Sequence, residues 1–214
     1  MTLIGRTALI EQNDATVAFL QANDFSRALV SSILALSYSR TFLDESETAN
    51  EQSSGSLDEC MLLSATVSES GDEISGTFIY EHAVIIPTTA EEIDPTILIA
   101  IPIFNAALAH HQLAKQNLFC HWTRMHLLTR AKQLYELAYK SCDLEHNPLF
   151  HFALINNMAV IERDIGNMPT ANECFEYLLT LLIVFVDRGC ELRLRHVRGF
   201  VANVPLAIKN APAA

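Results

Sequence analysis

Apolar residues recur along most of this 214-residue chain with the spacing of amphipathic helices. They return at intervals of three and four, and Asn, Asp, Gly and Pro mark the ends of these stretches. The pattern predicts helices over residues 8–22, 25–42, 94–115, 125–144, 149–165 and 169–188. With one further short helix in the tail, we expect a mainly all-α protein of about six or seven helices, forming a single domain over residues 1–214.

Three residues mark where the predicted helices start, bend and end. Asp24 is a suitable N-cap, because its carboxylate can accept hydrogen bonds from the first turn of the next helix. Gly166 is a suitable left-handed C-cap, because glycine has no Cβ. Pro102 lies inside an otherwise helical stretch, so either the helix is kinked there or its regular part begins close by.

Two neighbouring stretches lack the helical pattern. Residues 43–75 are rich in Ser, Glu, Gly and Asp, which predicts an acidic, partly disordered insertion. Residues 76–87 are rich in β-branched and aromatic residues, which predicts a short extended or β segment. This segment either lies against the helices or pairs with residues 61–67, "MLLSATV", as a small hairpin.

The charge distribution argues against one class of partner. The formal net charge is −11, and 13 of the 25 acidic residues lie between Thr41 and Ala114, a stretch without Lys or Arg. Because such a stretch repels phosphate groups, we expect no nucleic-acid partner.

Cysteine use and hydropathy favour a cytoplasmic protein, with a nuclear location left open. The five cysteines contain no CxxC pair and are typical of free thiols in a reducing compartment. The first residues contain no apolar run long enough for a signal peptide. The longest apolar run, residues 178–186, is about half a membrane span, so we predict a buried helix and no membrane partner.

A pattern of small and aromatic residues recurs in the second helices of three predicted helical hairpins. Its members are Ala28 in the first hairpin, Ala131, Tyr135 and Ala138 in the second, and Gly166, Ala171 and Phe175 in the third. Residues at i, i+4 and i+7 share one helix face, so alanine permits close helix contact and the aromatic ring fills the remaining space. The second hairpin carries 12 extra residues at its turn, "QNLFCHWTRMHL".

This pattern resembles the tetratricopeptide repeat (TPR), a family of stacked helical hairpins. The family's turn glycine, small residue and aromatic residue match Gly166, Ala171 and Phe175. The start of its first helix resembles "FNAA" at 104–107 and "INNMA" at 155–159. The resemblance implies a TPR-like α–α superhelix that includes the acidic insertion and the extended segment.

The resemblance covers residues 9–42 and 101–187 and departs from the family at two first-helix positions. Glu162 and His110 stand where the family has an aromatic residue. The N-terminal hairpin also has Ser32 where an aromatic residue is expected.

The resemblance also implies a groove for peptides, lined by the first helix of each hairpin. By this reasoning the partner-binding residues are Asn105, His111, Asn156 and Asn157. The predicted first helices carry almost no basic residue, with Arg163 near an end, so we expect no clamp for a peptide carboxylate. An alternative role for Asn157 is a hydrogen bond between neighbouring helices.

One group of residues has the chemistry of metal ligands. It comprises His110, His111, Cys120, His121 and His126, but their spacing matches no standard zinc signature. Adjacent histidines on a helix point about 100° apart, so His110 and His111 do not easily share one ion. No phosphate loop, nucleophile motif or dinucleotide fingerprint is present in the sequence, so we expect no catalytic residue and no cofactor.

The sequence therefore favours a non-catalytic scaffold that binds another protein or a peptide. Two alternatives remain at this point. One is a metal-binding enzyme or sensor that uses the His and Cys residues around 110–126. The other is a helical protein that self-associates through residues 177–186 and forms a homo-oligomer.

Overall fold

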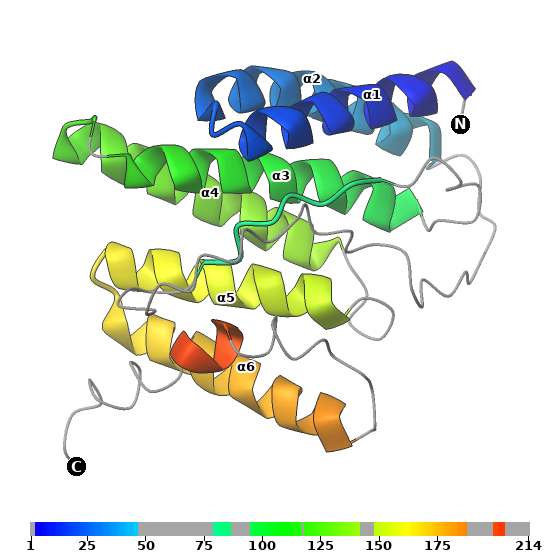
Figure 1. Ribbon diagram of the computed structural model, residues 1–214. Helices are drawn as coiled ribbons and strands as arrows, with labels where there is room; N and C mark the ends of the chain where they lie inside the picture. Colours follow the sequence, from blue (N-terminus) through cyan, green and yellow to red (C-terminus); the bar gives the residue numbers. More distant parts are fainter. Residues whose placement is uncertain are drawn as a thin grey trace, which may run out of the picture. The chain divides into compact units, whose positions relative to one another are not determined.

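The computed structural model describes residues 3–46, 79–86, 95–116, 118–141, 148–187 and 199–203. Over these ranges the chain is mainly helical and contains no strand (Figure 1), which confirms the predicted all-α class. The helices are α1 (Leu3–Gln21), α2 (Phe25–Ser46), α3 (Pro95–Lys115), α4 (His121–Lys140), α5 (Pro148–Asp164) and α6 (Met168–Asp187). A short helical stretch follows at 199–203.

Four predicted helix ends need correction. Helix α1 begins at Leu3, five residues earlier than predicted, and helix α4 ends at Lys140, four residues earlier than predicted. Helix α2 continues to Ser46, so the first residues of the predicted insertion are helical, and 47–75 lie outside the described residues. Helix α4 begins at His121, four residues earlier than predicted, because Cys120 is extended and its carbonyl accepts the first helical bond from Arg124. Helix α3 runs through Pro102, so its regular part does not begin there.

The chain divides into two compact units. Unit 1 contains α1 to α4 and residues 82–86, and unit 2 contains α5, α6, residues 79–81 and residues 199–203.

Helix α3 is the centre of unit 1. It contacts α1, α2 and α4, and Figure 1 shows it beside these helices. Nearly every residue from Ile97 to Ala109 is buried, including Phe104 and Leu108. A helix that is apolar on all sides is stable in water only when other elements surround it. This explains why α3 takes the interior position.

Unit 2 is built around one helical hairpin, α5 and α6. Its core contains Ile79, Ala159, Val160, Ala171 and Phe175, with Cys174 packed against it. Ala171 and Phe175 lie one helical turn apart on α6, so they present a small and a large side chain to the same interior.

The turns after α1 and α5 are closed in the same way. Asn23 and Gly166 both have left-handed backbones, with φ of 56° and 88°. The amide of the next residue bonds back to Phe19 or Glu162, and the amides of Asn23 and Gly166 bond to Leu20 and Arg163. These are the paired bonds of a Schellman C-cap, which confirms the cap predicted at Gly166.

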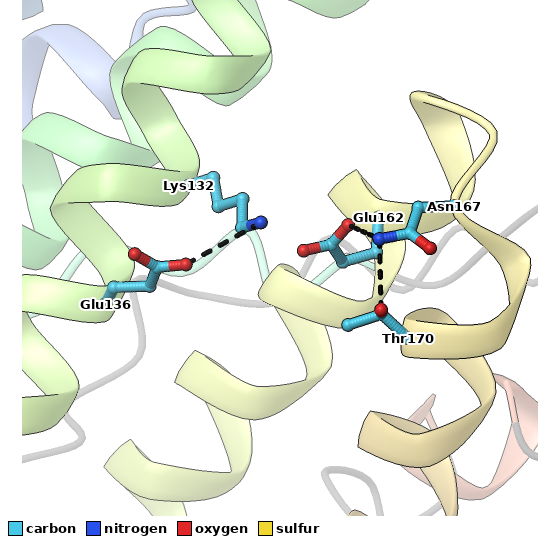
Figure 2. A network of polar contacts seen from close by, with 5 residues as sticks. All are labelled: Lys132, Glu136, Glu162, Asn167 and Thr170. Atoms are coloured by element: carbon cyan, nitrogen blue, oxygen red, sulfur yellow. Dashed lines mark hydrogen bonds and ion pairs between the residues drawn. The ribbon is translucent and has the colours of Figure 1, made fainter.

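Polar side chains form hydrogen bonds at the start of the helices after these turns. Asp24 accepts a hydrogen bond from the amide of Arg27 (3.2 Å), which confirms the predicted N-cap. Figure 2 shows Asn167 donating to Glu162 (2.9 Å) and to Thr170 (3.0 Å). Glu162, which departs from the repeat pattern, is therefore a buried acceptor at the turn. Both turns direct the second helix back along the first.

The positions of the small-and-aromatic pattern are interior positions. Ala28, Ala131, Tyr135, Ala138, Ala171 and Phe175 are all buried. The Tyr135 ring packs between Phe104 (5.6 Å between centroids) and His111 (6.1 Å). In both units, therefore, an aromatic residue four positions after a buried alanine fills the core.

Residues 79–86, hereafter the internal segment, form neither helix nor strand and follow an elongated path in Figure 1. The proposed hairpin partner at 61–67 and residues 76–78 and 87 lie outside the described residues. The apolar side chains of Ile79, Tyr80, Ala83, Val84 and Ile86 are buried. The segment thus lies against the helices, which is the first of the two predicted arrangements.

Candidate functional site

In unit 1, two asparagines bind the main chain of Val84. The amide N–H of Val84 donates to Asn105 Oδ1 (2.9 Å), and Asn105 Nδ2 donates to the Val84 carbonyl (2.8 Å). Asn13 Nδ2 donates to the same carbonyl (3.1 Å), and Asn105 Nδ2 also donates to Asn13 Oδ1 (2.8 Å). Val84, Asn105 and Asn13 are all buried, so these bonds are shielded from water.

In unit 2, Asn157 of α5 binds the main chain of Tyr80 in the same way. The amide N–H of Tyr80 donates to Asn157 Oδ1 (2.8 Å), and Asn157 Nδ2 donates to the Tyr80 carbonyl (3.0 Å). A side-chain amide carries one acceptor and one donor group side by side. It therefore matches the N–H and C=O of a single residue in an extended chain.

Two further asparagines form hydrogen bonds that hold the side chain of Asn157 in place. Asn156 Nδ2 donates to Asn157 Oδ1 (3.2 Å), and Asn203 Nδ2 donates to Asn156 Oδ1 (2.7 Å). All three residues are buried. The short helical stretch at 199–203 therefore fixes the orientation of the side chain that binds Tyr80.

Asn105 and Asn157 share one local feature. Each lies two residues before a fully buried alanine, Ala107 or Ala159. Nine residues further on the hairpins differ, because Gly166 is the left-handed C-cap of α5 whereas Ala114 is a buried residue within α3. Asn13 and Asn203 were missed, because an isolated asparagine within a helix has no distinctive neighbours.

His111 lies on α3 in the interior of unit 1. Neither of its ring nitrogens has a hydrogen-bond partner within the described ranges of the chain, and its ring contacts Tyr135 edge-on. Burial lowers the pKa of His111 from 6.5 to about 3, and Lys115 adds a smaller effect in the same direction. His111 is therefore neutral at physiological pH and fills space beside Tyr135.

The candidate metal ligands do not converge. His110 is half-buried, its Nδ1 is 2.8 Å from the Ala106 carbonyl, and desolvation lowers its pKa. Cys120 and His121 are exposed, and a hydrogen bond with Thr123 lowers the pKa of the Cys120 thiol. No three His, Cys, Asp or Glu side chains of the described residues form a group suited to a metal ion.

The described first helices carry little positive charge. Lys115 is the basic residue in the last turn of α3, and Arg163 is the one in the last turn of α5. The side chains that bind the main chain of Val84 and Tyr80 are neutral amides. Such surroundings suit a neutral peptide main chain better than a carboxylate.

Two helices are long and apolar enough to cross a membrane by length and composition. In α3 (Thr96–Lys115), 89% of the most apolar window is buried inside the protein, as in a core helix. In α6 (Met168–Asp187) the share is 22%. The exposed large apolar side chains of α6 are Tyr177, Ile183, Val184 and Val186.

Comparison with known proteins adds no relative. The chain matches no protein-family model, no curated protein and no solved structure.

Proposed function

We propose that this chain is a non-catalytic, TPR-like helical scaffold that binds an extended segment of another protein. The observation that carries the proposal is the pairing of Asn105 and Asn157 with main-chain groups of an extended segment. A buried amide that binds both the N–H and the C=O of one residue is suited to hold a peptide without regard to its side chains. We propose a cytoplasmic location for this activity.

The helical hairpins support the scaffold part of the proposal. Asn105 and Asn157 lie on the first helix of their hairpins, and the second helices pack through buried alanines and an aromatic ring. Side chains on packed helices hold their positions better than side chains on loops. The asparagines are therefore presented with fixed orientation, which reduces the entropic cost of binding.

A comparison of captured proteins tests this function. The full chain is immobilised and exposed to native extract, with three variants beside it: Asn105→Ala, Asn157→Ala and a deletion of residues 47–75, which leaves α2 intact. We expect a defined partner bound by the wild type and lost with either asparagine, while the exposed control Gln133→Ala retains it. A partner set that is identical for the wild type and both asparagine variants would contradict the proposal.

A second candidate function is self-association through α6. The exposed apolar side chains Ile183, Val184 and Val186 favour it, since exposed apolar clusters commonly mark protein interfaces. Light scattering at micromolar concentration distinguishes the two candidates. A dimer that becomes a monomer in Ile183→Lys supports self-association, and a monomeric wild type removes it.

A further inference from the structure

Three large apolar side chains of unit 1 are exposed together at the turn between α3 and α4. Trp122 is 82% exposed and Leu118 is 79% exposed, and Phe119 is exposed as well. They lie in the turn itself and in the first turn of α4. Figure 1 shows this turn at the end of the α3–α4 hairpin, beyond the turn that joins α1 to α2. Leu118, Phe119 and Trp122 are hereafter called the apolar tip.

The sequence on either side of the apolar tip carries charge of one sign. No Asp or Glu lies between Asp94 and Glu136, although the formal net charge of the chain is −11. Lys115 ends α3 and Arg124 lies in the first turn of α4, and both side chains are exposed. The other basic residues of this stretch are Arg130 and Lys132. In the sequence, therefore, the apolar tip has positive charge before and after it.

This combination suits the surface of an anionic lipid membrane. Trp, Phe and Leu enter the boundary between head groups and acyl chains, where an apolar ring or chain leaves water. A Lys or Arg near an anionic lipid surface gains about fivefold in affinity. The cytoplasmic leaflet contains anionic lipids, so this partner agrees with a cytoplasmic location.

The size of the apolar tip favours a lipid surface over a protein. If each of its three side chains buried about 200 Å², the tip would supply about 600 Å². A stable protein interface buries about 800 Å² on each partner. Insertion into a lipid surface requires no such continuous area, because the acyl chains close around each inserted side chain.

We propose that the apolar tip inserts into the surface of an anionic lipid membrane, with Lys115 and Arg124 in contact with the head groups. This surface belongs to unit 1 alone, and it adds a location at the membrane to the proposed scaffold function. Insertion of a tip needs no membrane-spanning run of apolar residues. Binding through so few side chains is reversible, so the protein exchanges between the membrane and the surrounding solution.

The fluorescence of Trp122 tests the proposal, because it is the only tryptophan of the chain. The full chain is mixed with vesicles of phosphatidylcholine alone, or of equal parts of phosphatidylcholine and phosphatidylserine. With the anionic vesicles we expect emission at shorter wavelength and quenching by lipids brominated on their acyl chains, because the ring leaves water. With phosphatidylcholine alone we expect binding at least about tenfold weaker, measured by co-sedimentation.

One double variant removes apolar side chains and keeps Trp122 as the reporter. Leu118→Ser/Phe119→Ser changes two exposed positions, so the fold is retained. We expect its binding to the anionic vesicles to be at least about tenfold weaker than that of the wild type. The matched control is Leu137→Ser, which removes an exposed apolar side chain near the other end of α4 and leaves binding unchanged.

A second double variant removes positive charge. For Lys115→Gln/Arg124→Gln we expect binding to the anionic vesicles to be about 30-fold weaker, at about fivefold for each charge. The matched control is Lys140→Gln in the last turn of α4. Lys140 is about 24 Å along the helix from Arg124, well beyond the screening length of about 10 Å in 0.1 M salt. We therefore expect this control to bind like the wild type.

Three results overturn the proposal. The first is an unchanged Trp122 emission in the presence of anionic vesicles. The second is binding that the two double variants retain, or that Leu137→Ser weakens as much as Leu118→Ser/Phe119→Ser does. The third is a Trp122 emission that a protein fraction shifts and vesicles do not, which identifies the apolar tip as a protein interface. The wild-type emission and its quenching by brominated lipids decide even if a variant does not fold.

Discussion

The two units bind the main chain with asparagines but reinforce them differently. In unit 1 the reinforcement acts on the bound residue, because Asn13 of the neighbouring hairpin donates to the same Val84 carbonyl as Asn105. In unit 2 the additional hydrogen bonds act on the binding side chain, because Asn156 and Asn203 form a chain of bonds that ends at Asn157.

This difference follows from the elements that each unit has available around its asparagine site. Unit 1 has a central helix, α3, in contact with several others, so a second helix, α1, also reaches the site. The described part of unit 2 has one hairpin and uses the short stretch 199–203, which contributes both Asn203 and the ring of Phe200. We therefore expect unit 2 to depend more on single side chains than unit 1 does.

The largest effect is expected for Phe175→Ala. Phe175 is buried against Ile79 and Ala171, so its removal leaves a cavity in the only hairpin of the described part of unit 2. We expect a loss of about 3–5 kcal/mol in the free energy of unfolding. Hydrogen exchange read separately for each unit is the measurement, since the units need not unfold together. We expect this loss of stability in unit 2, and no such loss in the exposed control Glu173→Ala.

The second-largest effect on stability is expected at the two asparagine sites, and its size differs between them. Asn157→Ala and Asn105→Ala each remove two hydrogen bonds to buried main-chain groups, at a cost of about 2–4 kcal/mol. In Asn105→Ala the Val84 carbonyl still accepts from Asn13. We therefore expect its cost to be smaller by about 1 kcal/mol. Hydrogen exchange of the Tyr80 and Val84 amides measures the stability cost of each substitution. A larger cost for Asn105→Ala than for Asn157→Ala would contradict the expected difference between the units.

A pH dependence is expected from His111 in unit 1. Its pKa is about 3 when folded and 6.5 in a model compound, so the unfolded chain binds one more proton between these values. Stability therefore falls as the pH drops through 6.5, by about 2 kcal/mol down to about pH 4.5. The measurement is denaturant unfolding against pH for the wild type and His111→Leu. Identical slopes for the two proteins would show that His111 does not cause the loss.

The smallest effect concerns the turns, where the two units are alike. Gly166 and Asn23 are both left-handed, and a Cβ added to Gly166 meets no atom within 4 Å, so backbone strain alone opposes a side chain there. We expect Gly166→Ala and Asn23→Ala each to cost about 1 kcal/mol. Gly166→Asn should stay within about 0.5 kcal/mol of the wild type. Unequal costs of the two alanine variants in denaturant unfolding would show that the turns differ.

Local patterns in the sequence were enough to locate the helices and two of their caps. The apolar spacing placed α3, α5 and α6 within about a residue of their observed ends, and Asp24 and Gly166 have the predicted roles. The start of α4 was missed because His121 to Arg124 are polar or exposed and lack an apolar period. The three asparagines Asn105, Asn156 and Asn157 could be listed from the sequence but not paired, since pairing depends on contacts between distant residues.

The sequence by itself determined most of the helices, two of their caps and the candidate asparagines Asn105, Asn156 and Asn157, because hydrophobic spacing, capping and local repetition act over a few residues. The tertiary structure decided what these asparagines bind. Val84 is 21 residues from Asn105, and Tyr80 is 77 residues from Asn157. A side-chain amide bonds equally well to any main chain that reaches it, so its partner is set by the packing of the apolar side chains on either side.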